Sequence, residues 1–198
     1  MPITIGMLIF DDAEELDFLG PWEVLTMAAK LHAAGDRVVT IAERSAPVRC
    51  AKGLRVLPDH AFGDAPKLDV LLVPGGQGTR REVDNPALIE WIRQTGAGCS
   101  WVTSVCTGAL LLHEAGLARG KRVTTYWSFI ETLRARGDVT VLEDVRYVRD
   151  GQLVTAAGIS AGIDMALWLT GQLWSVEHAR ATQRAIQYEP APPYAAEV

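Results

Sequence analysis

Short apolar runs alternate with amphipathic stretches along most of the chain. Four of these runs are too short for helices and are typical of buried strands. They are residues 3–10, 37–43, 69–76 and 100–105. Apolar positions at three- and four-residue spacing predict helices that begin at Gly20-Pro21, near Pro86 and directly after Cys106. Such an alternation of strands and helices predicts a mostly parallel sheet with helices on both faces.

The remaining segments continue this pattern. Residues 46–66 contain several Pro and Gly residues between short β-like pieces and predict a hairpin. We expect further helices at 127–136, 160–174 and 175–188, and strands at 139–142, 145–150 and 152–157. No repeat or long linker divides the chain. We therefore predict one domain over residues 1–198, a doubly wound α/β fold of the flavodoxin-like or class I glutamine amidotransferase-like type.

Composition narrows the class of function. The 198 residues are 48% hydrophobic and carry a net charge of -5, without the clustered Lys and Arg of a nucleic-acid surface. The first apolar run soon meets Asp11 and Asp12, which argues against a signal peptide or membrane span. Three cysteines without metal-ligand spacing predict neither a disulfide scaffold nor a metal. We expect a cytoplasmic enzyme with no cofactor, no nucleic-acid partner and no membrane.

Cys106 stands where the strand at 100–105 meets a predicted helix. The small residues that follow, Thr107, Gly108 and Ala109, leave room for a sharp turn. A nucleophile on such a turn lies at the carboxyl end of the sheet, where open α/β folds bind ligands. We expect the helix N-terminus to lower the pKa of the thiol into the range of about 3.5–7.5. The alternative is a small buried hydrophobic residue, but the position at a strand end favours a nucleophile.

The sequence provides no histidine base for this cysteine. His113 follows Cys106 by seven residues of the same helix, so it lies about 10 Å away, and we expect it to be exposed. His32, His60 and His178 lie on other predicted elements and give no evident pair. Cys50 and Cys99 are interpreted as buried structural residues.

Two further elements are predicted at the same edge of the sheet. Asp17 lies in the predicted loop after the first strand, and a carboxyl group there can exchange protons with a substrate bound to sulfur. Burial beside a thiolate would raise its pKa, although a capping or loop carboxylate is the alternative. The Gly75-Gly76 turn, together with the N–H of Thr107, is a candidate site for developing negative charge. It is not a dinucleotide fingerprint, because the G-x-G-x-x-G spacing is absent.

The motifs L-D-x-x-G-P, V-P-G-G and S-V-C-T-G-A together resemble those of the ThiJ/PfpI superfamily, relatives of the class I glutamine amidotransferases. The resemblance covers nearly the whole chain, and within the superfamily it is strongest to the isocyanide hydratases. These enzymes add water to R–N≡C and give an N-substituted formamide. The resemblance implies that Cys106 is the nucleophile, Asp17 its acidic partner and Thr107 its hydroxyl neighbour. It also implies a small-molecule isocyanide substrate, no cofactor and a homodimer.

Departures from the superfamily's patterns separate the possible activities. Peptidases of the superfamily have His where this chain has Thr107, and the glyoxalase and deglycase branches usually have Glu where it has Asp17. Many hydratase-like members have His where this chain has Tyr126. Relatives that regulate transcription add a C-terminal helix-turn-helix segment. Two alternatives stay open, a glyoxalase-like enzyme acting on α-oxoaldehydes and a non-catalytic redox sensor based on Cys106.

Three aromatic residues are candidates for an apolar substrate pocket. They are Trp22, Tyr126 and Trp127. Each is equally explained as an ordinary core aromatic. Their placement is therefore a question for the tertiary structure.

Overall fold

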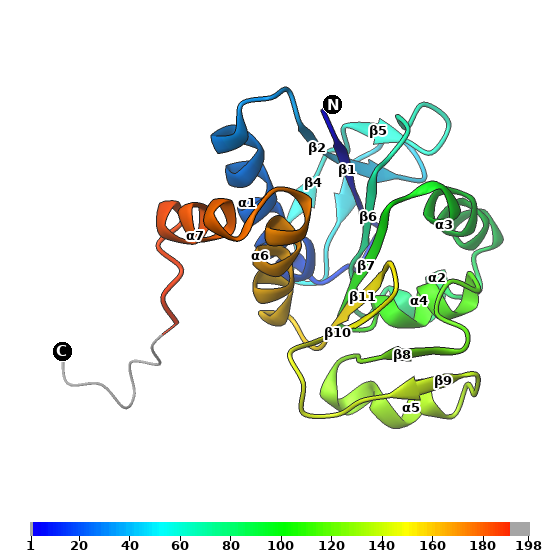
Figure 1. Cartoon of the computed structure of the whole chain (residues 1–198). Coiled ribbons are helices and arrows are strands. Elements are labelled where there is room, and N and C mark those ends of the chain that lie inside the picture. The colour runs from blue at the N-terminus through cyan, green and yellow to red at the C-terminus, as the bar shows by residue number, and fades with distance from the viewer. Residues whose placement is uncertain (1, 191–198) are drawn as a thin grey trace.

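A seven-stranded sheet forms the centre of the structure, a computed structural model that describes residues 2–190 (Figure 1). Its strands run in the order β10-β11-β7-β6-β1-β2-β5, and all neighbours are parallel except β10 and β11. The strands are β1 Thr4–Leu8, β2 Arg37–Ala42, β5 His60–Ala61, β6 Val70–Val73, β7 Trp101–Val105, β10 Tyr147–Asp150 and β11 Leu153–Ala156. The predicted mostly parallel α/β fold is confirmed.

Helices cover both faces of this sheet (Figure 1). The helices of the structure are α1 Glu15–His32, α2 Thr79–Glu82, α3 Pro86–Gly98, α4 Gly108–Glu114, α5 Ile130–Arg134, α6 Ala161–Leu173 and α7 Val176–Ala185, with a 3-10 turn at Trp127–Phe129. Helix α5 packs against β9 (Val139–Val141), which lies outside the central sheet. Helices α1, α6 and α7 pack together on one face, and α3 and α4 pack together on the other. Alternate residues of each strand enter the two cores, so that Leu72 of β6 faces α1 and α6 while Leu71 faces α3 and α4.

Two small strand pairs lie outside the central sheet. The predicted hairpin is present as β3 Val48–Arg49 and β4 Arg55–Val56, which pair antiparallel. The other pair is parallel and joins β8 Lys121–Val123 to β9 Val139–Val141. Within residues 2–190, no helix has both the length and the apolar character needed to cross a membrane.

The first helix begins earlier than predicted. It starts at Glu15, so Asp17 lies in its first turn and Pro21 lies inside the helix. Proline cannot donate to the carbonyl oxygen of Asp17 four residues before it, which costs one helical hydrogen bond. Close packing against α6 offsets this cost, because a Cβ added at Gly20 would lie 2.9 Å from Ile163 Cγ1. The proline therefore does not mark the start of the helix.

A second expectation, the exposure of His113, is also wrong. The side chain is buried, and its Nε2 lies 3.1 Å from the carbonyl oxygen of Gly137. The segment that carries Gly137 folds over this end of α4, a contact between residues 24 positions apart. Local helical spacing does not reveal such a contact.

Candidate active site

Cys106 lies on a sharp turn between β7 and α4, as predicted. Its φ angle is +56°, in the left-handed region that side chains other than glycine rarely adopt. The backbone N–H of Cys106 donates to the carbonyl oxygens of Ala157, at 2.7 Å, and Ala156, at 3.1 Å, which hold the turn against the end of β11. The strained conformation is therefore fixed by the sheet, as expected for a strand-to-helix turn that presents a side chain at the sheet edge.

The side chain of Asp17 lies against Cys106. It enters from the first turn of α1 and is fully buried. Its Oδ2 accepts a hydrogen bond of 2.9 Å from the backbone N–H of Gly75, at the end of β6. Its Oδ1 has no hydrogen-bond partner among residues 2–190, and the carboxyl group faces the sulfur of Cys106. Three adjacent parallel strands, β1, β6 and β7, thus bring the predicted acid and nucleophile together at their carboxyl ends.

The electrostatics of this pair differ in part from the prediction. Burial raises the pKa of Asp17 to about 7, with a smaller contribution from the charge of Glu14. This agrees with the expected direction. Burial also raises the pKa of Cys106 to about 12, and the nearby charge of Asp17 adds to the rise. The predicted low thiol pKa is wrong, because desolvation and the carboxylate outweigh the N-terminus of a seven-residue helix.

The two groups are in contact, so their protons leave the pair in two steps rather than from each residue alone. Above about pH 7 the pair carries one negative charge and retains one proton. That proton resides either on the sulfur or on the carboxyl group. The arrangement is suited to moving a proton between Cys106 and a molecule bound to it.

The glycine turn after β6 has a different function from the one expected. The N–H of Gly75 is used by Asp17, and the N–H of Gly76 donates to Thr107 Oγ1 at 3.1 Å. These amides therefore orient the acid and the hydroxyl instead of facing a substrate. Gly75 is required by close approach, since an added Cβ would lie 2.8 Å from Cys106 Cβ. Thr107 contacts the sulfur of Cys106 with both its backbone N–H and its hydroxyl.

Thr79 and Arg80 also belong to this site, and sequence analysis did not identify them. Thr79 is fully buried, with its Oγ1 at 3.0 Å from Thr107 Oγ1 and 2.8 Å from the carbonyl oxygen of Gly76. Arg80 Nη1 donates to the same carbonyl oxygen at 2.9 Å. In the sequence these residues belong to an ordinary polar stretch after the glycine turn, which carries no catalytic motif.

No histidine completes the site among the residues that the structure describes. The ring of His178 pairs with the carbonyl oxygen of Ala28, a residue of α1, at 2.9 Å. His32 and His60 contact acidic neighbours on their own segments.

A cavity of about 780 Å³ lies beside the Cys106 turn. It is lined by residues 124–127, 130, 143–146 and 157–160. The hydroxyl of Thr125 donates to the carbonyl oxygen of Cys106 at 2.8 Å, and the carbonyl oxygen of Ala157 accepts from the N–H of Cys106, so the wall of the cavity is hydrogen-bonded to the backbone of Cys106. Tyr126 and Trp127 line this cavity, whereas Trp22 does not.

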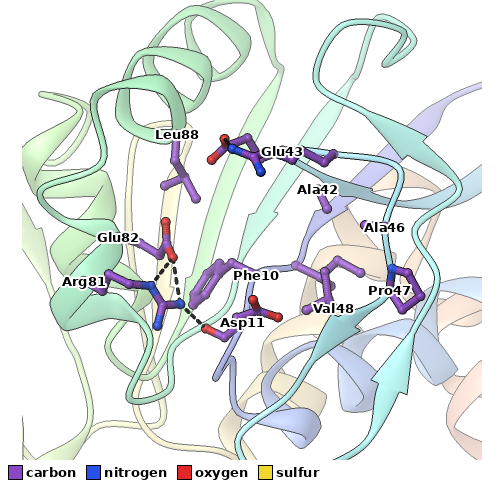
Figure 2. A pocket seen from close by; sticks show the side chains of 12 residues that line it. Phe10, Asp11, Ala42, Glu43, Ala46, Pro47, Val48, Arg81, Glu82 and Leu88 are labelled. Atoms are coloured by element: carbon purple, nitrogen blue, oxygen red, sulfur yellow. Dashed lines mark hydrogen bonds and ion pairs between the residues drawn. The ribbon is translucent and has the colours of Figure 1, made fainter.

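A second cavity, of about 280 Å³, lies beyond the carboxyl ends of β1 and β2 (Figure 2). Figure 2 shows Arg81 at its edge, paired with Glu82 and hydrogen-bonded to the carbonyl oxygen of Asp11. The side chains of Cys106 and Asp17 line neither of the two cavities. In the described part of the chain, no three side chains of the metal-ligating types gather at one place.

Comparisons with known proteins show which proteins this chain resembles in sequence and in fold. The model of the DJ-1/PfpI family matches residues 4–172. An isonitrile hydratase of Pseudomonas putida is 40% identical over 194 residues, covering 98% of this chain and 82% of that protein. A glutathione-independent glyoxalase of Caenorhabditis elegans, DJR-1.2, is 26% identical over 159 residues, covering 79% and 81%. A solved ThiJ/PfpI family protein from Pseudomonas syringae has a TM-score of 0.90 at 30% identity, covering 100% of this chain and 80% of its own.

Proposed function

The chain belongs to the DJ-1/PfpI family, and on that premise we propose that it is an isocyanide hydratase. It adds water to R–N≡C and releases an N-substituted formamide. The observation that carries the proposal is the buried carboxyl of Asp17 in contact with Cys106, with its pKa raised to about 7. The likeness to the isonitrile hydratase of Pseudomonas putida over 98% of the chain supports the same substrate class.

The first half of the reaction joins the thiol to the substrate carbon. The sulfur of Cys106 attacks the terminal carbon of R–N≡C, and its proton passes to Asp17. Asp17 then delivers that proton to the same carbon, which gives the thioimidate R–N=CH–S–Cys106. Thr107 donates to the sulfur through its N–H and hydroxyl while negative charge develops there.

Water completes the reaction in the second half. The water attacks the thioimidate carbon while Asp17 removes a proton from the water, and Asp17 then passes that proton to the substrate nitrogen. The resulting adduct, R–NH–CH(OH)–S–Cys106, collapses with cleavage of the C–S bond, and its hydroxyl proton returns to the sulfur. The products are R–NH–CHO and regenerated Cys106. One water molecule is consumed, and no redox change or cofactor is needed.

We propose that the cavity beside Cys106 receives the R group. Its lining includes the aromatic rings of Tyr126 and Trp127 and the apolar side chains of Ile130 and Ile159. Trp127 is 75% exposed, so an apolar R group that covers its ring would remove apolar surface from water. Tyr126, which stands where many hydratase-like relatives have His, then contributes to substrate preference.

The test is a substrate panel that includes several alkyl and aryl isocyanides beside methylglyoxal, with formamide and lactate measured as products. We expect formamide from the isocyanides. The second candidate is a glyoxalase acting on α-oxoaldehydes, which the likeness to the glyoxalase of Caenorhabditis elegans favours. Lactate without any formamide would refute the hydratase and support this candidate. We also propose a homodimer that functions in the cytoplasm, with the dimer measurable by light scattering.

A further inference from the structure

We propose that Thr79 and Arg80 are positioning residues that adjust the reactivity of Cys106 through the hydroxyl of Thr107. Both come from the short helix α2, which directly follows the glycine turn. Neither lies against the sulfur in the way that Asp17 and Thr107 do. Their influence therefore depends on the hydrogen bonds between them and Thr107.

The carbonyl oxygen of Gly76 is the acceptor around which this network is built. It has two lone pairs, and its short side-chain contacts are Thr79 Oγ1 at 2.8 Å and Arg80 Nη1 at 2.9 Å. The hydroxyl of Thr107 and the N–H of Thr79 are longer donors to the same oxygen, at 3.2 Å and 3.3 Å. Because the carbonyl oxygen already has two closer donors, the hydroxyl hydrogen of Thr107 is available for the sulfur of Cys106.

The hydroxyl of Thr107 also receives hydrogen bonds. Its oxygen accepts from the N–H of Gly76 at 3.1 Å and lies 3.0 Å from Thr79 Oγ1. A hydroxyl that accepts two hydrogen bonds is a better donor of its own hydrogen, because aligned hydrogen bonds polarise one another. Thr79 thus strengthens the bond from Thr107 to sulfur whenever it donates to Thr107.

Hydroxyl hydrogens rotate to suit their partners, so the network has two arrangements. When Cys106 is protonated, Thr79 donates to the carbonyl oxygen of Gly76. When the sulfur is an anion, Thr79 turns to Thr107, and Thr107 donates to the sulfur. Arg80 continues to donate to Gly76 in both arrangements, so the carbonyl oxygen keeps a partner when Thr79 turns away.

The position of Arg80 is fixed independently of this network. Its guanidinium carbon lies 4.7 Å from the centre of the Phe129 ring. The same nitrogen that donates to Gly76 lies 3.2 Å from Thr79 Oγ1. A charged donor held in this place favours the arrangement in which Thr79 donates to Thr107 and Thr107 donates to the sulfur. The network therefore stabilises the thiolate of Cys106, whereas the burial of Cys106 and the negative charge of Asp17 destabilise it.

The test compares T79V, which keeps the side-chain shape but lacks the hydroxyl, with T79S, which keeps the hydroxyl. The rate of Cys106 alkylation by iodoacetamide is measured against pH by peptide mass spectrometry. We expect T79V to alkylate about 2- to 12-fold more slowly at neutral pH, the range that one hydrogen bond is worth, with its profile moved to higher pH. T79S should follow the wild type.

T103V is the matched control, because Thr103 is also fully buried and donates to the carbonyl oxygen of Leu71 within the sheet. Its alkylation profile should equal that of the wild type. R80M removes the charged donor of Arg80. Because Arg80 is exposed, this variant should fold and provides the test if T79V does not fold. In the T79V/R80M double variant the two effects should not add, because both act through Thr107.

A T79V or R80M profile that superimposes on the wild type would overturn the proposal, as would T79S as slow as T79V. The kinetic readout rests on the proposed function: kcat for isocyanide should fall in T79V with KM unchanged. Alkylation does not depend on that function. A wild type inert to isocyanides with a shifted T79V profile would reject the hydratase and retain the network.

Discussion

Replacing Asp17 with Asn tests the central electrostatic claim through protein stability. Burial raises the pKa of this carboxyl to about 7 in the folded protein, from an ordinary value of 3.8. The folded state therefore retains a proton that the unfolded state has lost at intermediate pH. The bound proton contributes to the free energy of unfolding. This contribution is complete below pH 3.8 and is lost as pH rises through 7. Asn cannot ionise, so D17N lacks this loss.

The magnitude follows from the two pKa values. The full shift of about 3 pKa units corresponds to about 4 kcal/mol, of which about 3 kcal/mol is lost between pH 5 and pH 8. In that interval the wild type should lose about 3 kcal/mol of unfolding free energy relative to D17N. The amide oxygen of Asn can still accept from the N–H of Gly75, so the local geometry is retained. A fixed cost for the unpaired amide N–H₂ is the same at both pH values and leaves the difference unchanged.

Urea unfolding of both proteins at pH 5, 6, 7 and 8 measures this difference. D84N removes one exposed carboxylate and controls for the change in net charge. Parallel free-energy profiles for the wild type and D17N would refute the raised pKa. Such a result would also remove the reason to regard Asp17 as a proton carrier at neutral pH.

Three further outcomes follow from the proposed chemistry. C106S should produce no formamide, because a serine hydroxyl without a strong base is too weak a nucleophile for this step; product detected by mass spectrometry would contradict it. In steady-state assays D17N should lower kcat about 10²–10⁴-fold while Cys106 still reacts with iodoacetamide, and a near-normal rate would exclude Asp17 from the reaction. For the wild type, kcat/KM should rise with pH through about 7, as the Cys106–Asp17 pair loses its first proton; D17N should lack this rise.

The sequence determined the elements that depend on neighbouring residues. A buried apolar run that ends at Cys106 and continues into small residues specifies the turn locally, and the structure has it with φ +56°. The parallel arrangement follows from the alternation of strands and helices. It places the ends of β1, β6 and β7 at one edge, which brings Asp17 to Cys106. The place of Asp17 after the first strand was therefore enough to predict that it lies at the same edge of the sheet as Cys106.

Only the tertiary structure determined the pKa values, the hydrogen bonds and the burial of the side chains at the site. The pKa of Cys106 depends on how much water is removed from the thiol and on a carboxylate 89 positions away in the chain. Local helix position predicts the opposite direction. The hydrogen bonds of Thr79, the burial of His113 and the start of α1 at Glu15 likewise depend on segments distant in sequence. Desolvation and through-space charge are properties of the packed molecule, whereas strand and helix periodicity is a property of the chain.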